Sequence, residues 1–182
     1  MSFLEKRANW KNIRVVLVVY LVFSLFLFPY YQDQVDTIAR EPLTALDLRM
    51  QYSLEDARTL LDKMQPAGRD ISRIISGRVD MVYPIVYGLF LMLLIIRLSK
   101  GLKFRHHPWL LSGPLLAMLF DYLENFQVLR MLRQYPDISS ELVRFSALMS
   151  SLKWLFVGIS LLMVLMPGLI QMNILIRQKR SQ

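Results

Sequence analysis

The sequence predicts an all-α protein: a four-helix transmembrane bundle with a small, partly helical extracytoplasmic cap between the first two spans. Of its 182 residues, 54% are hydrophobic and only 20% are charged, whereas soluble domains are roughly 45 to 50% apolar. The apolar residues form four continuous stretches, each near or above the roughly 17 to 25 residues that cross a hydrocarbon core. A transmembrane barrel would instead alternate apolar and polar residues, so it is excluded. The predicted spans are 13–31, 80–98, 109–129 and 145–170, and the cap is 32–79.

The first predicted span follows basic residues, which is also the pattern of a secretory signal peptide. Its apolar run is longer than the roughly 7 to 15 residues of a signal peptide. It ends without the small-residue pair that a signal peptidase prefers, although Thr37 and Ala39 leave a weak cleavage option. We therefore expect this segment to be retained as a span.

The basic residues indicate the topology. The net charge of +8 is also typical of nucleic-acid-binding proteins, but the bases cluster at the ends of the predicted spans, so no nucleic-acid partner is expected. Cytoplasmic loops are enriched in Lys and Arg, which places both termini and the loop between the second and third spans in the cytoplasm. These segments contain one acid, Glu5. Their bases are Lys6, Arg7, Lys11 and Arg14 before the first span, Arg97, Lys100, Lys103 and Arg105 between the second and third spans, and Arg177, Lys179 and Arg180 after the fourth.

Cysteine is absent, which excludes disulfides, thiolate metal ligands and cysteine nucleophiles. An extracytoplasmic segment without disulfides is compatible with a multi-pass protein of the bacterial cytoplasmic (inner) membrane, and an organelle membrane stays open. No cofactor is expected, because no glycine-rich phosphate loop or hydrolase elbow is present. His106 and His107 lie beside Lys103 and Arg105, so we interpret them as a basic patch touching anionic lipid and expect no metal site.

The cap contains two readable pieces. Residues 46–52 alternate between apolar and polar side chains, which predicts a short extended segment. Ser53 and Asp56 then have the spacing of a capping box, so a helix is predicted to begin there. No internal repeat or linker is visible, and the chain 1–182 is interpreted as a single membrane domain.

Three polar residues lie in the middle of the apolar segment 109–129. Asp121, Glu124 and Asn125 are related by i, i+3 and i+4, so they project from one face of a helix. Each charge in a span costs about 2.5 to 3.5 kcal/mol even on a lenient insertion scale, so partners, water or a function must offset it. Lys153 is predicted at a matching depth in the last span, within about one helical turn.

The second span adds three polar residues on one face: Asp80, Tyr83 and Tyr87. They enter from the outside at overlapping depths, so the polar faces of the spans are predicted to converge in the outer half of the bundle. The predicted ligand-binding residues of this outward-opening pocket are Asp121, Glu124, Asn125, Lys153, Asp80, Tyr83 and Tyr87.

Two interpretations of this cluster stay open. In the first, Lys153 pairs with Asp121 or Glu124, and the polar groups only fix how the helices pack. In the second, the carboxylate that Lys153 does not neutralise serves a function. With two acids against one lysine, one acid is expected to hold a proton, which suits proton transfer or capture of a polar headgroup. Asp121 and Glu124 are therefore the candidate catalytic residues.

These interpretations give three candidate functions. The leading one is binding of a lipid or other lipophilic molecule in the pocket, and the sequence leaves open whether catalysis follows. The alternatives are a membrane enzyme that transfers protons on a lipid substrate, or a structural or accessory subunit of a membrane complex. Membrane lipids are the expected partners, and a homo-oligomer or a partner in a membrane complex stays open.

Four motifs carry a resemblance to a known family: YSLEDA at 52–57, GR at 68–69, YPIVYG at 83–88 and DYLEN at 121–125. In combination they resemble a widespread group of small, uncharacterised bacterial four-span integral membrane proteins. The resemblance runs from residue 52 to about residue 153, and it implies four spans and no catalytic assignment. The layout is also loosely similar to the four-span sterol isomerase and sigma-2 receptor class, whose members bind lipophilic ligands with acids inside the bundle.

Overall fold

The computed structural model describes residues 2–102 and 108–180, and every regular element within these ranges is helical. The all-α prediction is therefore confirmed for the described residues. The predicted basic patch at Lys103, Arg105, His106 and His107 lies outside them. The α-helices are α1 (Ser2–Arg7), α2 (Trp10–Val22), α3 (Phe28–Ala39), α4 (Leu54–Lys63), α5 (Gln65–Ile74), α6 (Asp80–Leu98), α7 (Ser112–Gln134) and α8 (Ser140–Arg180).

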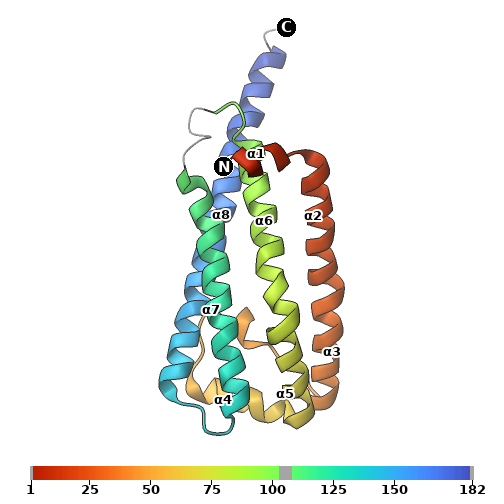
Figure 1. The fold of residues 1–182 in the computed structure, drawn as a ribbon, viewed down its shortest axis with the longest axis vertical. Helices are drawn as coiled ribbons and strands as arrows, with labels where there is room; N and C mark the ends of the chain where they lie inside the picture. The colour runs from red at the N-terminus through yellow and green to blue at the C-terminus, as the bar shows by residue number, and fades with distance from the viewer. Residues whose placement is uncertain (1, 103–107, 181–182) are drawn as a thin grey trace.

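Two pairs of these helices merge into longer ones through π-helical turns. The turn Phe23–Leu27 joins α2 to α3, and the turn Ile75–Val79 joins α5 to α6. In Figure 1 the resulting long helices run alongside α7 and α8. We call the two ends of this arrangement the α1 end, where both termini lie, and the α4 end.

Within the described ranges, three helices are long and apolar enough to cross a membrane: Trp10–Ala39, Gln65–Leu98 and Ser140–Ile174. They contain three of the four predicted spans and extend beyond the predicted bounds. Helix α7, which covers the predicted third span, is not among them, because its acids and arginines lower its hydropathy. These helices are typical of an integral membrane protein.

Helix α7 packs closely against α8 and α6. A Cβ atom added to Gly113 of α7 would lie 2.9 Å from Ser160 Oγ and 3.4 Å from the Ser160 backbone of α8. Ala117, one turn further along α7, is fully buried. On the other side, Gly88 of α6 lies directly against the Met118 side chain. Small residues thus let α7 approach both neighbours, as expected for helices that associate in a bilayer.

Residues 43–53, which we call the strap, run from the α4 end back between the helices before α4 begins (Figure 1). The predicted extended piece is wrong at its start, because Leu46–Leu48 forms a 3-10 turn. Leu46 and Tyr52 are buried, whereas Leu48 and Met50 are each 62% exposed. The alternation fails because the backbone carbonyls of the strap bond to side chains of α8 rather than to a neighbouring strand.

The predicted capping box at the start of α4 is confirmed. Ser53 Oγ accepts a hydrogen bond from the Asp56 backbone N–H at 3.1 Å, and an Asp56 carboxylate oxygen accepts one from the Ser53 N–H at 2.8 Å. The Ser53 backbone hydrogen bond lowers the pKa of the exposed Asp56 carboxyl. This box ends the strap and fixes the direction in which α4 leaves it.

Candidate functional site

The buried polar cluster lies on the face of α7 that meets α8. Asp121, Glu124 and Asn125 are all buried, and Glu124 has no exposed surface. Lys153 of α8 is buried opposite them. Its Nζ lies 2.6 Å from Glu124 Oε2 and 3.8 Å from Asp121 Oδ1. The predicted pairing of Lys153 with these acids is therefore present, and the shorter contact is to Glu124.

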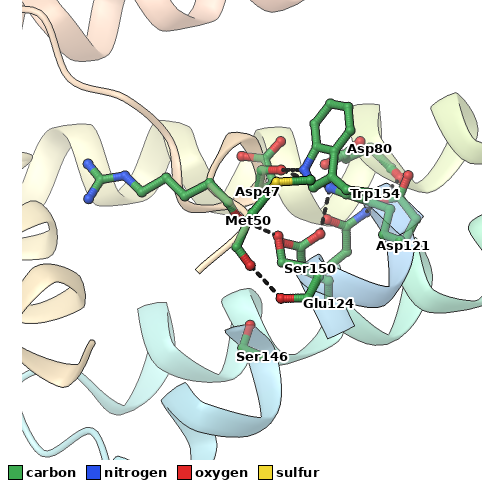
Figure 2. A network of polar contacts seen from close by, with 12 residues as sticks. Asp47, Met50, Asp80, Asp121, Glu124, Ser146, Ser150 and Trp154 are labelled. Carbon is green, nitrogen blue, oxygen red and sulfur yellow. Dashed lines mark hydrogen bonds and ion pairs between the residues drawn. The ribbon is translucent and has the colours of Figure 1, made fainter. Parts of the chain in front are cut away.

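Asn125 ties the cluster to α6. Its Nδ2 donates to the backbone carbonyl of Asp80 at 3.1 Å and lies 3.5 Å from Asp121 Oδ1. Asp80 is only 5% exposed, and its carboxylate forms no hydrogen bond or ion pair with any described residue. A third buried carboxyl group thus enters the cluster from α6 without a partner (Figure 2).

The strap reaches this cluster with its backbone. The Asp47 carbonyl accepts from Lys153 Nζ at 2.9 Å and from Trp154 Nε1 at 3.2 Å. The hydroxyls of Ser150 and Ser151 donate to the carbonyls of Arg49 and Met50, each at 2.6 Å. Figure 2 shows these contacts beside Asp80, Asp121 and Glu124. Buried carbonyls need donors, and α8 supplies them to the strap.

A side chain fastens the far end of the strap. The Tyr52 hydroxyl donates to Ser146 Oγ at 2.7 Å. Burial raises the pKa of the Tyr52 phenol, so the group stays a neutral donor. From its tip at Asp47 to Tyr52, the strap is therefore attached to one face of α8.

Acceptors outnumber donors in the cluster. Glu124 Oε1 is buried and has no hydrogen-bond partner among the described residues. Ser150 is close to this carboxylate. Its hydroxyl can donate one hydrogen bond, and it donates that bond to the Arg49 carbonyl. Asp80 also lacks a donor. The Tyr87 hydroxyl is the cluster's remaining buried donor without a partner among the described residues, so the cluster still has fewer donors than acceptors, and it has one lysine for three carboxyl groups.

The two predicted tyrosines take different positions. Tyr87 is buried, and its hydroxyl lies near the Asp121 carboxylate. Tyr83 faces α2 and α3 instead: its hydroxyl lies 3.2 Å from Ser24 Oγ, and its ring stacks on Tyr20 with 5.8 Å between centroids. The two tyrosine rings touch edge to face at 5.4 Å. Tyr87 thus lines the cluster, and Tyr83 lies behind it.

Two surface cavities lie away from the cluster. One, of about 400 Å³, lies between α7 and α8 toward the α4 end, and Gln127, Arg130 and Glu141 are among its lining residues. The other, of about 240 Å³, lies between α1, α2 and α6. No carboxylate of the buried cluster lines either of them. The predicted outward-opening pocket at the cluster therefore stays a prediction.

The structure brings five of the seven predicted residues into direct contact: Asp80, Asp121, Glu124, Asn125 and Lys153. Sequence reasoning missed the strap, and with it Asp47 and Trp154. One signal was available, since Asp47 is an acid between two leucines in a segment otherwise assigned to a cap. Its approach to Lys153 depends on the chain turning back between the helices, which no local pattern indicates.

No family model matches the chain, and no curated protein or solved structure matches it. The fold and the site define a helical protein with three helices long and apolar enough to cross a membrane. The distinguishing feature of its interior is an acid-rich cluster with one lysine, covered by a backbone strap.

Proposed function

We propose that the chain is a four-span protein of the bacterial cytoplasmic membrane, with α7 as the third span. At 23 residues, α7 is about 35 Å long, and it packs along α8, so Asp121, Glu124 and Asn125 are buried in protein and shielded from lipid. The exposed bases Lys6, Lys11 and Arg14 lie at the α1 end. The bias of bases toward the cytoplasm supports placing the α1 end inside and the α4 end outside, with the strap entering from the outside.

We propose further that the buried cluster binds the polar head of a lipid or other lipophilic molecule. The observation that carries this proposal is that Glu124 Oε1 is buried without a hydrogen-bond partner among the described residues, while the Asp80 carboxylate is buried nearby and accepts no hydrogen bond from them. A buried carboxylate without a donor is costly. A ligand head that carries a protonated amine supplies both the missing donors and the missing charge, so amine-bearing amphiphiles fit this site best.

Such a ligand would take its place beside Asp80 and Tyr87 rather than displace Lys153. The Lys153 ammonium is already paired with Glu124 and donates a hydrogen bond to the Asp47 carbonyl. Asp80 forms no ion pair with a described residue. The ring of Tyr87 borders the same region, and aromatic faces attract cations. The strap covers the cluster, so binding requires the strap to move away from α8.

Asp80→Asn provides the sharpest test. The full chain is purified in detergent, and its thermal stability is measured with increasing dodecylamine, dodecanol or dodecyl sulfate. Binding to the folded state raises the melting temperature, and the shift grows with the logarithm of the ligand concentration relative to Kd. We expect dodecylamine alone to stabilise the protein, Asp80→Asn to abolish that shift, and Asp137→Asn, at an exposed position, to preserve it.

Two results would overturn the proposal. One is equal stabilisation by dodecanol and dodecylamine, which would indicate nonspecific uptake of apolar chains. The other is a dodecylamine shift that survives in Asp80→Asn. Because Asp80 has no partner in the unliganded protein, Asp80→Asn should not lower the basal melting temperature, so loss of binding is distinguishable from loss of folding.

A structural role is the second candidate, and a specific observation favours it. The 2.6 Å contact between Lys153 and Glu124 and the hydrogen bonds from α8 to the strap satisfy most of the cluster internally. If that is the whole role, substitutions at Glu124 and Asp80 change stability alone, and no amphiphile shifts the melting temperature selectively.

A further inference from the structure

A second candidate site lies at the α1 end, away from the buried cluster. It is a groove of about 240 Å³ between α1, α2 and α6. Leu93 of α6 is almost fully buried, whereas Phe3 of α1 and Val15 of α2 are exposed. The lining is apolar except for Arg7 and Asn12, and it also includes Val16 and Leu89.

The two polar lining residues lie where α1 meets α2. Asn12 Nδ2 donates to the Arg7 backbone carbonyl at 2.9 Å, which ties α1 to α2. The Arg7 side chain is exposed, and its guanidinium lies 5.5 Å from the centroid of the Phe3 ring. It forms no hydrogen bond or ion pair with any residue that the structure describes. Its donors are therefore available to a ligand in the groove.

Further positive charge surrounds this junction. Arg97, at the end of α6, lies over the Trp10 ring at 5.3 Å, and its Nε is buried without a partner in the described part of the chain. Lys11 and Arg14 are exposed on the first turns of α2. Arg14 uses its Nε on the Trp10 carbonyl at 3.2 Å, so the apolar groove opens beside a group of cations in which the Arg7 guanidinium and Arg97 Nε are without hydrogen-bond partners among the described residues.

We propose that this groove binds an anionic phospholipid, with one acyl chain between α2 and α6 and the phosphate at Arg7. The apolar floor excludes a free phosphate as the natural occupant, because a free phosphate would gain nothing from Leu89 and Leu93. The basic rim selects an anionic over a zwitterionic lipid. Arginine forms paired hydrogen bonds with phosphate oxygens, and the placement of Arg7 suits that contact.

This proposal rests on the placement of the helices in a membrane but is independent of the buried cluster. The groove and the cluster share no residue. Each of the two sites can therefore be lost while the other is retained.

The experiment uses the delipidated full chain in detergent, with binding measured by native mass spectrometry and by the shift in melting temperature. The probes are phosphatidylglycerol and phosphatidylcholine of identical acyl chains, and inorganic phosphate. We expect phosphatidylglycerol to bind more tightly than phosphatidylcholine, and inorganic phosphate to have no effect. Arg7→Gln should weaken the binding of phosphatidylglycerol about fivefold, since one base near an anionic membrane surface contributes about that factor to affinity. Arg133→Gln, an exposed position at the α4 end, should leave binding unchanged.

A groove-filling variant tests the acyl-chain part of the proposal. Val16→Phe should reduce binding of both lipids, whereas Val22→Phe, on an exposed part of α2, should not. Because Arg7 is exposed, Arg7→Gln should fold normally, and it tests the proposal even if Val16→Phe fails to fold. Equal affinity for the two lipids, an equal loss in Arg133→Gln, or competition by inorganic phosphate would each overturn the proposal.

Discussion

Lys153 Nζ lies 2.6 Å from Glu124 Oε2 and 3.8 Å from Asp121 Oδ1, so the lysine of α8 pairs first with the glutamate of α7. Its third contact is the Asp47 carbonyl of the strap. One side chain therefore joins α7, α8 and the strap. Asp80 is outside this arrangement and keeps an unpaired carboxylate, which makes the cluster both a structural joint and a candidate binding site.

The difference between the two distances predicts unequal effects of neutralising the two acids. Glu124→Gln removes the closer partner and leaves a buried ammonium, and breaking a buried pair in this way costs about 3 to 5 kcal/mol. Asp121→Asn should cost less, because Lys153 keeps its contact with Glu124. Chemical or thermal unfolding in detergent measures both. Equal losses would show that the two acids share the lysine.

The ion pair between Lys153 and Glu124 should also show a strong coupling energy in a double-mutant cycle. Lys153→Met alone leaves Glu124 buried without a cation and should be strongly destabilising. Combined with Glu124→Gln, it should restore part of the lost free energy of unfolding, because no uncompensated charge is left at that contact. Additive losses in the double variant would contradict the pairing.

Movement of the strap can be followed by thiol labelling, because the chain has no native cysteine. Leu46→Cys places a thiol at a buried strap position, so we expect slow labelling by a maleimide. Adding Ser150→Ala removes the hydrogen bond to the Arg49 carbonyl and should speed labelling severalfold. Asp137→Cys, at an exposed position, serves as the fast reference. An unchanged rate in the double variant would mean that this hydrogen bond does not hold the strap.

Close packing of α7 on α8 gives a prediction with a matched control. Gly113→Leu would drive a side chain into the backbone of α8 at Ser160 and should destabilise the protein by about 1 to 3 kcal/mol, as overpacking does. A Cβ added to Gly158 meets nothing within 4 Å, so Gly158→Leu should leave the melting temperature nearly unchanged. Similar losses in both variants would point to a general cost of leucine in these helices instead.

The proposed orientation is testable in intact cells with a membrane-impermeant maleimide. Asp137→Cys lies in the loop between α7 and α8 at the α4 end and should be labelled. Lys6→Cys, in α1, should be labelled only after the membrane is permeabilised. Labelling of both positions in intact cells would contradict a four-span topology, because it would place the two ends on the same side of the membrane.

Composition and periodicity were enough to predict the helices. Continuous apolar runs predict spans because the thickness of the hydrocarbon core sets the length of an apolar helix that crosses it, whatever the neighbouring helices are. The capping box at Ser53 is similarly local, since both of its partners lie within four residues. Asp121, Glu124 and Asn125 were identified for the same reason: helical spacing alone places them on one face.

Other features depended on contacts between distant segments. The strap contacts α8 across about a hundred residues of sequence, whereas its alternating pattern predicted a short extended piece within the cap. Tyr83 and Tyr87 share one face of α6, but packing directs one toward α2 and the other toward α7.

The sequence by itself thus predicted an all-α chain with four spans and an acid-rich face on the third of them, and among the described residues the structure bears out the helices, three of which are apolar enough to cross a membrane. Only the tertiary structure decided that Lys153 pairs more closely with Glu124 than with Asp121, that the strap covers the cluster, and that Asp80 is left without a partner. The reason is physical. Local periodicity specifies which way a side chain points from its own helix, whereas its partner depends on how neighbouring helices are rotated and where the chain between them runs.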